Sequence, residues 1–160
     1  MNDSLMPEWM KKKQQQNELL EAKREAERQR EMAAHNLIQL KAPGFLKELE
    51  EKLAIAVEFL PKLQMEGLLT SFIGGLRVSV SKPGIFANQT YTDLHINTRD
   101  IRCTMLNGGA YTLPFAVVSD TEIGVAYDSM SGAVMNASKA SEYIIGRMID
   151  MIESMPSTRN

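Results

Sequence analysis

The sequence predicts an α+β protein: an N-terminal charged helical arm, then a two-layer domain of a helix, an antiparallel sheet of about four or five strands and a C-terminal helix. Three observations support this fold class. The chain opens with charged residues that favour helices. Two later stretches have the spacing of amphipathic helices, and between these two stretches lie short segments in which apolar and polar residues alternate. We expect the arm at residues 1–42, the domain at 43–155 and a disordered tail at 156–160.

Composition limits the class of protein. The chain has 160 residues, of which 44% are hydrophobic and 24% charged, which is typical of one globular domain with an appendage. Up to Lys41 there are 8 basic and 7 acidic residues, and after it 10 and 13. Neither part has the basic excess of a nucleic-acid binder, so the sequence argues against that class.

Cysteine and histidine content restricts the chemistry further. Cys103 is the single cysteine and the chain has 2 histidines, so we expect no disulfide framework, no zinc finger and no other metal site or cofactor. The first 16 residues lack the apolar stretch of a secretory signal, and no run reaches the length of a membrane span. These absences predict a cytoplasmic protein.

The arm is expected to be helical from about Met10 to Leu40. This stretch is rich in Lys, Arg, Glu, Gln and Ala and contains neither Gly nor Pro. Counted in heptads, one core position holds Leu19, Ala26, Ala33 and Leu40, and the other holds Ala22, Gln29 and Asn36. This is a thin apolar seam for a coiled coil.

Two interpretations of the arm therefore stay open. In one, the arm binds a partner helix through Leu19, Ala26 and Ala33. In the other, it is a solvated helix whose last turns, at residues 37–40, dock on the domain. Three lysines beside Trp9 are too few for the basic clusters that bind anionic membranes, so a membrane partner is not expected.

Pro43 and Gly44 are expected to end the arm helix, because Pro removes a helical donor and Gly favours a turn. A second helix should follow and end near Pro61. Its apolar stripe has spacings of three and four and consists of Leu46, Leu49, Leu53, Val57 and Leu60.

The sheet is predicted from residues that alternate between apolar and polar. The expected strands are 75–80, 91–97, 101–106, 110–118 and 123–128. Asn107-Gly108 is typical of a type I′ hairpin turn, and residues 98–100 form a turn or a bulge. Pro114 cannot donate to a strand ladder, so we expect an edge strand or a bulge there.

The last helix is expected within residues 136–154, with Asn136 or Ser138 as its N-cap. Its apolar stripe consists of Ile144, Ile145, Met148, Ile149 and Ile152. Met151 and Met155 lie at the margin of that stripe and are candidates for an apolar strip that binds a partner.

The sequence contains no phosphate-binding loop, nucleophile elbow or zinc-protease motif. Gly74 and Gly75 precede a strand, where a turn or a bulge explains them better than a phosphate site. Cys103 lies between apolar residues on its strand face, which favours a buried hydrophobic side chain over a nucleophile.

Asp93 and His95 are the best candidates for chemistry. They are two residues apart on one strand and so share a face with Tyr91. Asp93 could orient His95 as a general base, or the two could be ligands of a metal site that takes a third ligand from a neighbouring strand. The favoured alternative is the polar, solvated face of a sheet. If the domain does hold a ligand pocket between sheet and helices, Asp93, His95, Tyr111 and Tyr127 are its candidate polar groups.

These features favour a non-catalytic interaction or assembly protein, of an adaptor or chaperone-like kind, that binds a protein partner or self-associates. The alternative is a small ligand-binding domain or small enzyme. A weaker third hypothesis is nucleic-acid binding through the arm, which would weaken steeply with salt.

Overall fold

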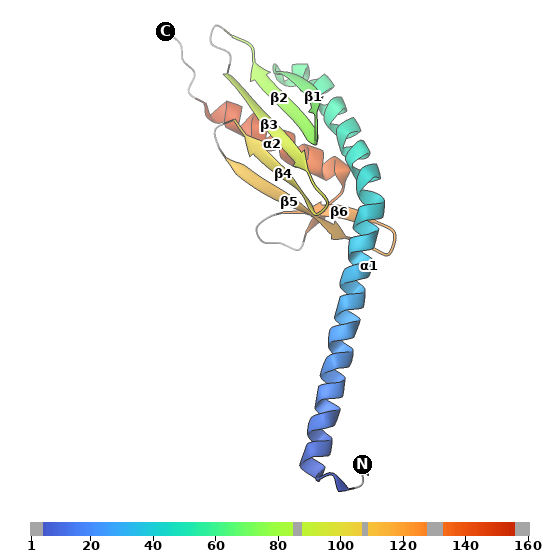
Figure 1. The fold of residues 1–160 in the computed structure, drawn as a ribbon. Coiled ribbons are helices and arrows are strands. Elements are labelled where there is room, and N and C mark those ends of the chain that lie inside the picture. Colours follow the sequence, from blue (N-terminus) through green and yellow to red (C-terminus); the bar gives the residue numbers. More distant parts are fainter. Residues whose placement is uncertain (1–4, 85–87, 107–108, 128–132, 156–160) are drawn as a thin grey trace. The chain divides into compact units, whose positions relative to one another are not determined.

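The computed structural model describes residues 5–84, 88–106, 109–127 and 133–155 (Figure 1). Its helices are α1 (Glu8–Phe59), the short 3-10 helix η2 (Leu60–Leu63) and α2 (Ala137–Ser154). Its strands are β1 (Glu66–Phe72), β2 (Gly75–Lys82), β3 (Asn88–Ile96), β4 (Asp100–Met105), β5 (Ala110–Val117), β6 (Ile123–Ala126) and β7 (Val134–Met135). The predicted tail at 156–160 and the Asn107-Gly108 turn lie outside the described residues.

The chain divides into two compact units, Met1–Asn36 and Leu37–Asn160. In the first unit, the described chain is the exposed N-terminal part of α1. The second unit contains the rest of α1, the sheet and α2, and it holds the hydrophobic core. Of the residues expected to dock the arm on the domain, Ile38 packs against the core, whereas Leu40 is 74% exposed.

The expected break at Pro43 and Gly44 is wrong, because α1 continues through both residues to Phe59. The two are exposed, but their neighbours Ala42, Phe45 and Leu46 pack against the core. Burial of these neighbours stabilises the helix even though Pro43 cannot donate a backbone hydrogen bond. Tertiary packing therefore overrides the local preference of Pro and Gly for a helix end. The end of the helix is as predicted, with Pro61 in the first turn of η2.

The sheet is an antiparallel meander in which each described strand pairs with its neighbours in sequence, in the order β1 to β7. The five predicted strands are present, and β1 and β7 raise the number to seven. The sequence did not indicate β1 because its residues do not alternate between apolar and polar: Leu68 and Leu69 are adjacent, with Leu68 exposed and Leu69 half-buried, and the strand ends with three exposed residues. With two residues, β7 is too short to show a period.

Pro114 does not mark an edge strand, because β5 has β4 on one side and β6 on the other. The Phe115 N–H donates to the Arg99 carbonyl at the β4 side. Successive N–H groups of a strand point to opposite sides, so the Pro114 nitrogen is directed toward β6. Pairing with β6 begins only at Phe115, so the missing donor removes no bond from that ladder.

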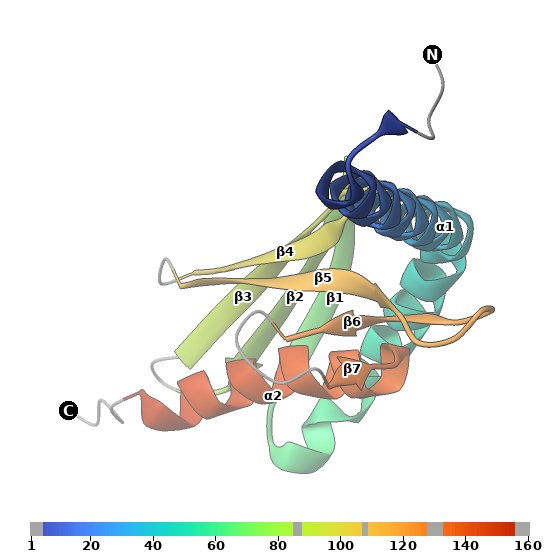
Figure 2. The same cartoon turned by 90° about the horizontal axis from the view of Figure 1, so that it is seen from below.

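The core lies between one face of the sheet and two helical segments, α2 and the part of α1 beyond residue 37 (Figure 2). The α1 segment contributes Phe45, Leu49 and Leu53, and the Phe45 ring packs edge-on against Phe115 at 6.0 Å between centroids. From α2 come Ala137, Ala140, Ile144, Ile145, Met148 and Ile152. The predicted two-layer α+β arrangement is confirmed.

Asn136 is the N-cap of α2, one of the two residues expected there. Its side-chain oxygen accepts a hydrogen bond from the Lys139 N–H at 2.8 Å. This bond satisfies one of the first-turn donors that have no partner inside the helix.

Candidate functional site

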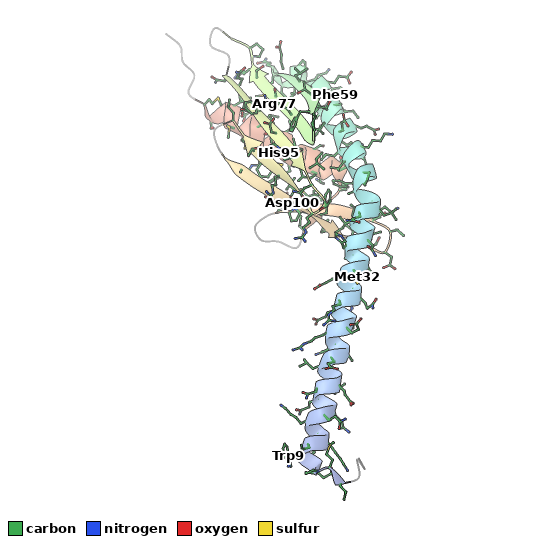
Figure 3. The ribbon with its side chains drawn as sticks, viewed as in Figure 1. Trp9, Met32, Phe59, Arg77, His95 and Asp100 are labelled. Carbon is green, nitrogen blue, oxygen red and sulfur yellow. The ribbon has the colours of Figure 1, made fainter. Side chains whose placement is uncertain are left out.

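The face of the sheet opposite the core carries the polar residues of β1 to β4, and we call it the open face (Figure 3). Strand register places the residues of this face in rows across the sheet. One row contains Thr70, Arg77, Asp93 and Thr104, and the next contains Phe72, Gly75, His95 and Arg102. The open face therefore brings together the two best sequence candidates, Asp93 and His95.

Asp93 is held by Arg77. The guanidinium donates through Nε to Oδ1 at 2.6 Å and through Nη2 to Oδ2 at 2.9 Å, and it also lies 4.1 Å from the centroid of the Tyr91 ring. The hydrogen bonds from Arg77 lower the pKa of Asp93, and those to Asp93 raise the pKa of Arg77. Both carboxylate oxygens are thus engaged by the arginine, which leaves Asp93 poorly placed to orient His95.

His95 is exposed on the open face. Its ring packs edge-on against Phe72 of β1, with 5.5 Å between the centroids. Gly75 lies opposite His95 on β2, and Arg102 lies opposite it on β4. The surroundings of His95 are therefore an aromatic ring and a cation, and the Asp93 carboxylate is bound to Arg77 instead.

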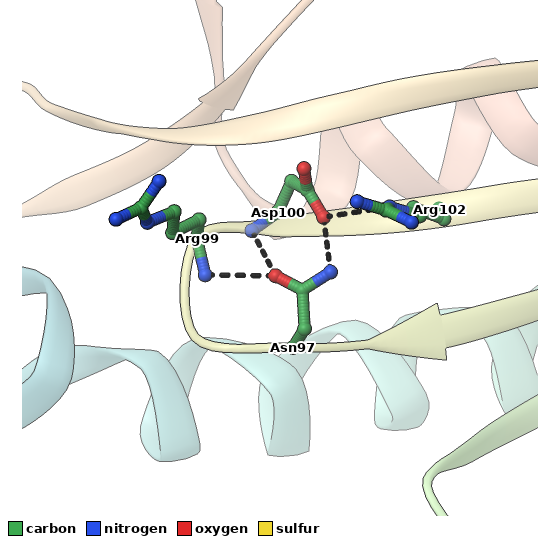
Figure 4. Close-up of polar contacts among 4 residues, drawn as sticks. All are labelled: Asn97, Arg99, Asp100 and Arg102. Atoms are coloured by element: carbon green, nitrogen blue, oxygen red, sulfur yellow. Dashed lines mark hydrogen bonds and ion pairs between the residues drawn. The ribbon is translucent and has the colours of Figure 1, made fainter.

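The turn between β3 and β4 is a compact polar cluster (Figure 4). Asn97 Oδ1 accepts hydrogen bonds from the N–H groups of Arg99 and Asp100, each at 2.9 Å, and Asn97 Nδ2 donates to Asp100 Oδ1. Arg102 Nε lies 3.7 Å from the same carboxylate oxygen. These contacts close a hairpin through an Asn side chain. Of the two expectations for residues 98–100 the turn is the one found, at Thr98 and Arg99, and Asp100 opens β4.

Tyr111 and Tyr127 belong to the core side of the sheet, not to the open face. Tyr111 is buried and Tyr127 is half-buried, and both rings pack edge-on against Tyr143 of α2, at 5.5 and 4.7 Å between centroids. Burial raises the pKa of Tyr111. The structure therefore joins the two tyrosines to each other through Tyr143, but separates them from Asp93 and His95 by the sheet.

Cys103 is a core residue, as expected. Its side chain is fully buried, and burial raises the pKa of the thiol to about 12. A thiol in this environment stays protonated at neutral pH and is a poor nucleophile.

The residues expected to bind a partner differ in exposure. Leu19, Ala26 and Ala33 are all exposed on α1, and Leu19 is 70% exposed. Met151 is half-buried against the core, and the Thr90 hydroxyl donates to its sulfur at 3.5 Å. Met155 is half-buried at the C-cap of α2. The arm thus presents more free surface than the methionines do.

The open face has one further feature, a hollow of about 250 Å³ over β1, β2 and β3. Leu68, Ser79, Gln89 and Tyr91 are among the residues that line it. None of the four predicted ligand-binding residues does so. The sequence did not indicate this place, because its lining depends on strand register.

Within the described ranges, no group of three or more His, Cys, Asp or Glu side chains is arranged to hold a metal ion. In the same part of the chain, no helix has both the length and the apolar character needed to cross a membrane.

No protein-family model matches the sequence, and neither a curated protein nor a solved structure is detectably similar to it.

Proposed function

We propose that this is a non-catalytic interaction or assembly protein, adaptor-like or chaperone-like, whose arm presents a helix to a helix of another protein. The observation that carries the proposal is the exposure of the arm: between Glu8 and Asn36, every residue except Lys11 and Ala34 is exposed. A helix without packing is stabilised only by weak local terms. Contact with a partner would supply the burial that this segment lacks.

The face that best fits a partner helix contains Leu19, Ala26 and Ala33, which are seven residues apart. Residues at this spacing share one side of a helix and form the seam of a coiled coil. Two of the three are alanines, whose small side chains let another helix approach closely. The thin seam favours a partner that supplies bulky apolar side chains of its own, rather than a strong pairing of two identical arms.

The alternative, a small-ligand site, has less support. Asp93 is bound to Arg77, Tyr111 is buried beneath the sheet, and the hollow on the open face is lined by other residues. Met151 packs against the core, so the proposal does not depend on the methionine surface. A cytoplasmic location remains a prediction that accompanies this proposal.

The test uses the full chain with Leu19→Glu, Ala26→Glu and Ala33→Glu combined. A matched control places Glu at Gln14, Asn17 and His35, which lie away from the seam on the same helix and give the same change in charge. Each protein is used to capture binding partners from the cells that make it, and the captured proteins are compared quantitatively.

We expect a partner that is retained by the wild type and by the control but lost from the seam variant. Circular dichroism establishes that both variants keep the helix. If the seam variant captures the same proteins in the same amounts as the control, the arm is not the binding element and the proposal fails.

A further inference from the structure

β1 is an edge strand of the sheet, and Val57 and Leu60 lie near its first residues, at Gly67. The strand lies at the end of the meander, where the described residues pair it with β2 alone (Figure 1). From Gly67 to Phe72 it has no charged residue and no proline. Proteins usually protect such edges with charges, prolines or bulges, because the free backbone groups of an edge bind other strands. An edge of this kind is an interaction surface.

The free backbone groups of β1 can be assigned from the ladder. The Ile96 N–H donates to the Gly74 carbonyl at 3.0 Å, and Gly75 lies opposite His95. In an antiparallel ladder this makes Gly75 and His95 a non-hydrogen-bonded pair. The backbone N–H and C=O of Gly75 therefore point away from β3 and toward β1, where they face Phe72 as a hydrogen-bonded pair. Alternation along β1 then directs the N–H and C=O groups of Gly67, Leu69 and Ser71 to the free edge.

Exposed apolar side chains accompany this edge. Leu68 is 60% exposed, and Ile73, at the tip of the β1–β2 hairpin, is fully exposed. Phe72 is partly exposed, and so are Phe59 and Leu63 in the segment that leads to β1. A strand that added to this edge would bury apolar surface as well as forming backbone hydrogen bonds.

We propose that β1 pairs antiparallel with β1 of a second copy of this chain, around a two-fold axis at Leu69. In this register Gly67 lies opposite the partner's Ser71, and Leu68 lies opposite the partner's Thr70. The three residues with outward backbone groups are spaced symmetrically about Leu69, so the edge matches itself, as a two-fold interface requires. The pairing joins the two sheets into one.

The charge pattern favours a second copy over another occupant. Glu66 is the one charged residue of β1, and in this register it lies opposite the partner's Phe72. No like charges face each other across the interface, and the central pairs are apolar or neutral. The inference uses β1 and not the arm, so it stands independently of the proposed function.

The first test is sedimentation of the full chain over a range of concentrations, with Ser71→Pro as the variant. Proline is tolerated on an edge strand where its nitrogen faces away from the neighbouring strand. Because the Ser71 N–H points to the free edge, the change leaves the ladder to β2 intact but removes two hydrogen bonds from each dimer. We expect a dimer that binds about thirtyfold more weakly than the wild type.

A second pair of variants tests the register through charge. Leu68→Lys with Thr70→Lys places like charges opposite each other twice in the dimer and should weaken it by about tenfold or more. Leu68→Lys with Thr70→Glu changes the same positions but places opposite charges there, and it should keep the dimer. Thermal unfolding of each variant establishes that the monomer fold is unchanged.

The pairing is overturned if the wild type sediments as a monomer at every concentration, which would leave the edge for a different protein or for none. It is also overturned if a wild-type dimer is insensitive to Ser71→Pro and to the paired lysines. A dimer abolished by the Leu19, Ala26 and Ala33 substitutions alone would assign self-association to the arm. That result would reject the β1 pairing and would make a second copy of this chain, rather than another protein, a partner of the arm.

Discussion

Arg77 and Asp93 lie directly opposite each other on β2 and β3, and two guanidinium nitrogens bind the two carboxylate oxygens at 2.6 and 2.9 Å. The same guanidinium covers the Tyr91 ring. This arrangement ties together two neighbouring strands on the open face. The sequence offered the Asp93 carboxylate as a catalytic partner for His95. In the structure, this carboxylate makes a structural contact with Arg77 instead.

The first prediction concerns the pH dependence of that pair. The pKa of Asp93 is lower in the folded protein than its ordinary value of 3.8. The ionised carboxylate therefore stabilises the fold fully at pH values above 3.8, and this stabilisation is lost as the pH falls through the pKa of the folded state. Asp93→Asn should therefore unfold at lower urea than wild type at neutral pH, with the difference closing in acid. Urea midpoints over this pH range measure the effect. As a control, Asp120→Asn changes an exposed turn residue and should follow wild type throughout.

The second prediction concerns two glycines with opposite surroundings. A Cβ on Gly75 would lie 1.9 Å from the Leu94 carbonyl oxygen, so Gly75→Ala must push β2 and β3 apart. We expect a loss of about 2 kcal/mol or more in the free energy of unfolding. Gly146→Ala, in α2 where a Cβ would meet nothing within 4 Å, should instead add about 0.5–1 kcal/mol. Chemical denaturation of both variants checks this, and equal effects would contradict the close approach at Gly75.

The third prediction follows from the continuity of α1. Pro43 lies inside the helix and is exposed. It removes a backbone hydrogen-bond donor, and its own side chain makes no buried contact that would offset this loss. Pro43→Ala should raise the free energy of unfolding by about 1–3 kcal/mol. Pro61→Ala is the matched control, since Pro61 lies at the start of η2, where a donor is not needed. If Pro43→Ala is destabilising or neutral, the helix is interrupted at this position.

The fourth prediction concerns the thiol. With a pKa raised to about 12 and a fully buried side chain, Cys103 should react with a thiol reagent at neutral pH only when the domain opens. The labelling rate of the native protein should be far below that of the protein in denaturant and should rise with added urea. Fast labelling of the folded protein would contradict the burial of Cys103.

The sequence was informative wherever one local pattern was strong. Alternation identified β2 to β6, and helical spacing identified α2 and the buried stripe of α1. The N-cap of α2 is Asn136, one of the two residues that the sequence offered. The sequence was wrong at Pro43 because a local rule predicted a break that packing on the opposite side of the helix overrides. It did not indicate β1 because an edge strand has one neighbour and partial burial, so its residues are not required to alternate.

The candidate site shows the same division. Alternation alone placed Asp93 and His95 on one face, because neighbouring side chains of a strand point to opposite sides. That Arg77 is the partner of Asp93, and that Tyr111 lies on the other side of the sheet, depended on the register between strands and on which face the helices cover. The sequence by itself determined the element types, the apolar faces and the charged arm. Only the tertiary structure decided which residues meet, because contacts between distant segments depend on packing that no local pattern encodes.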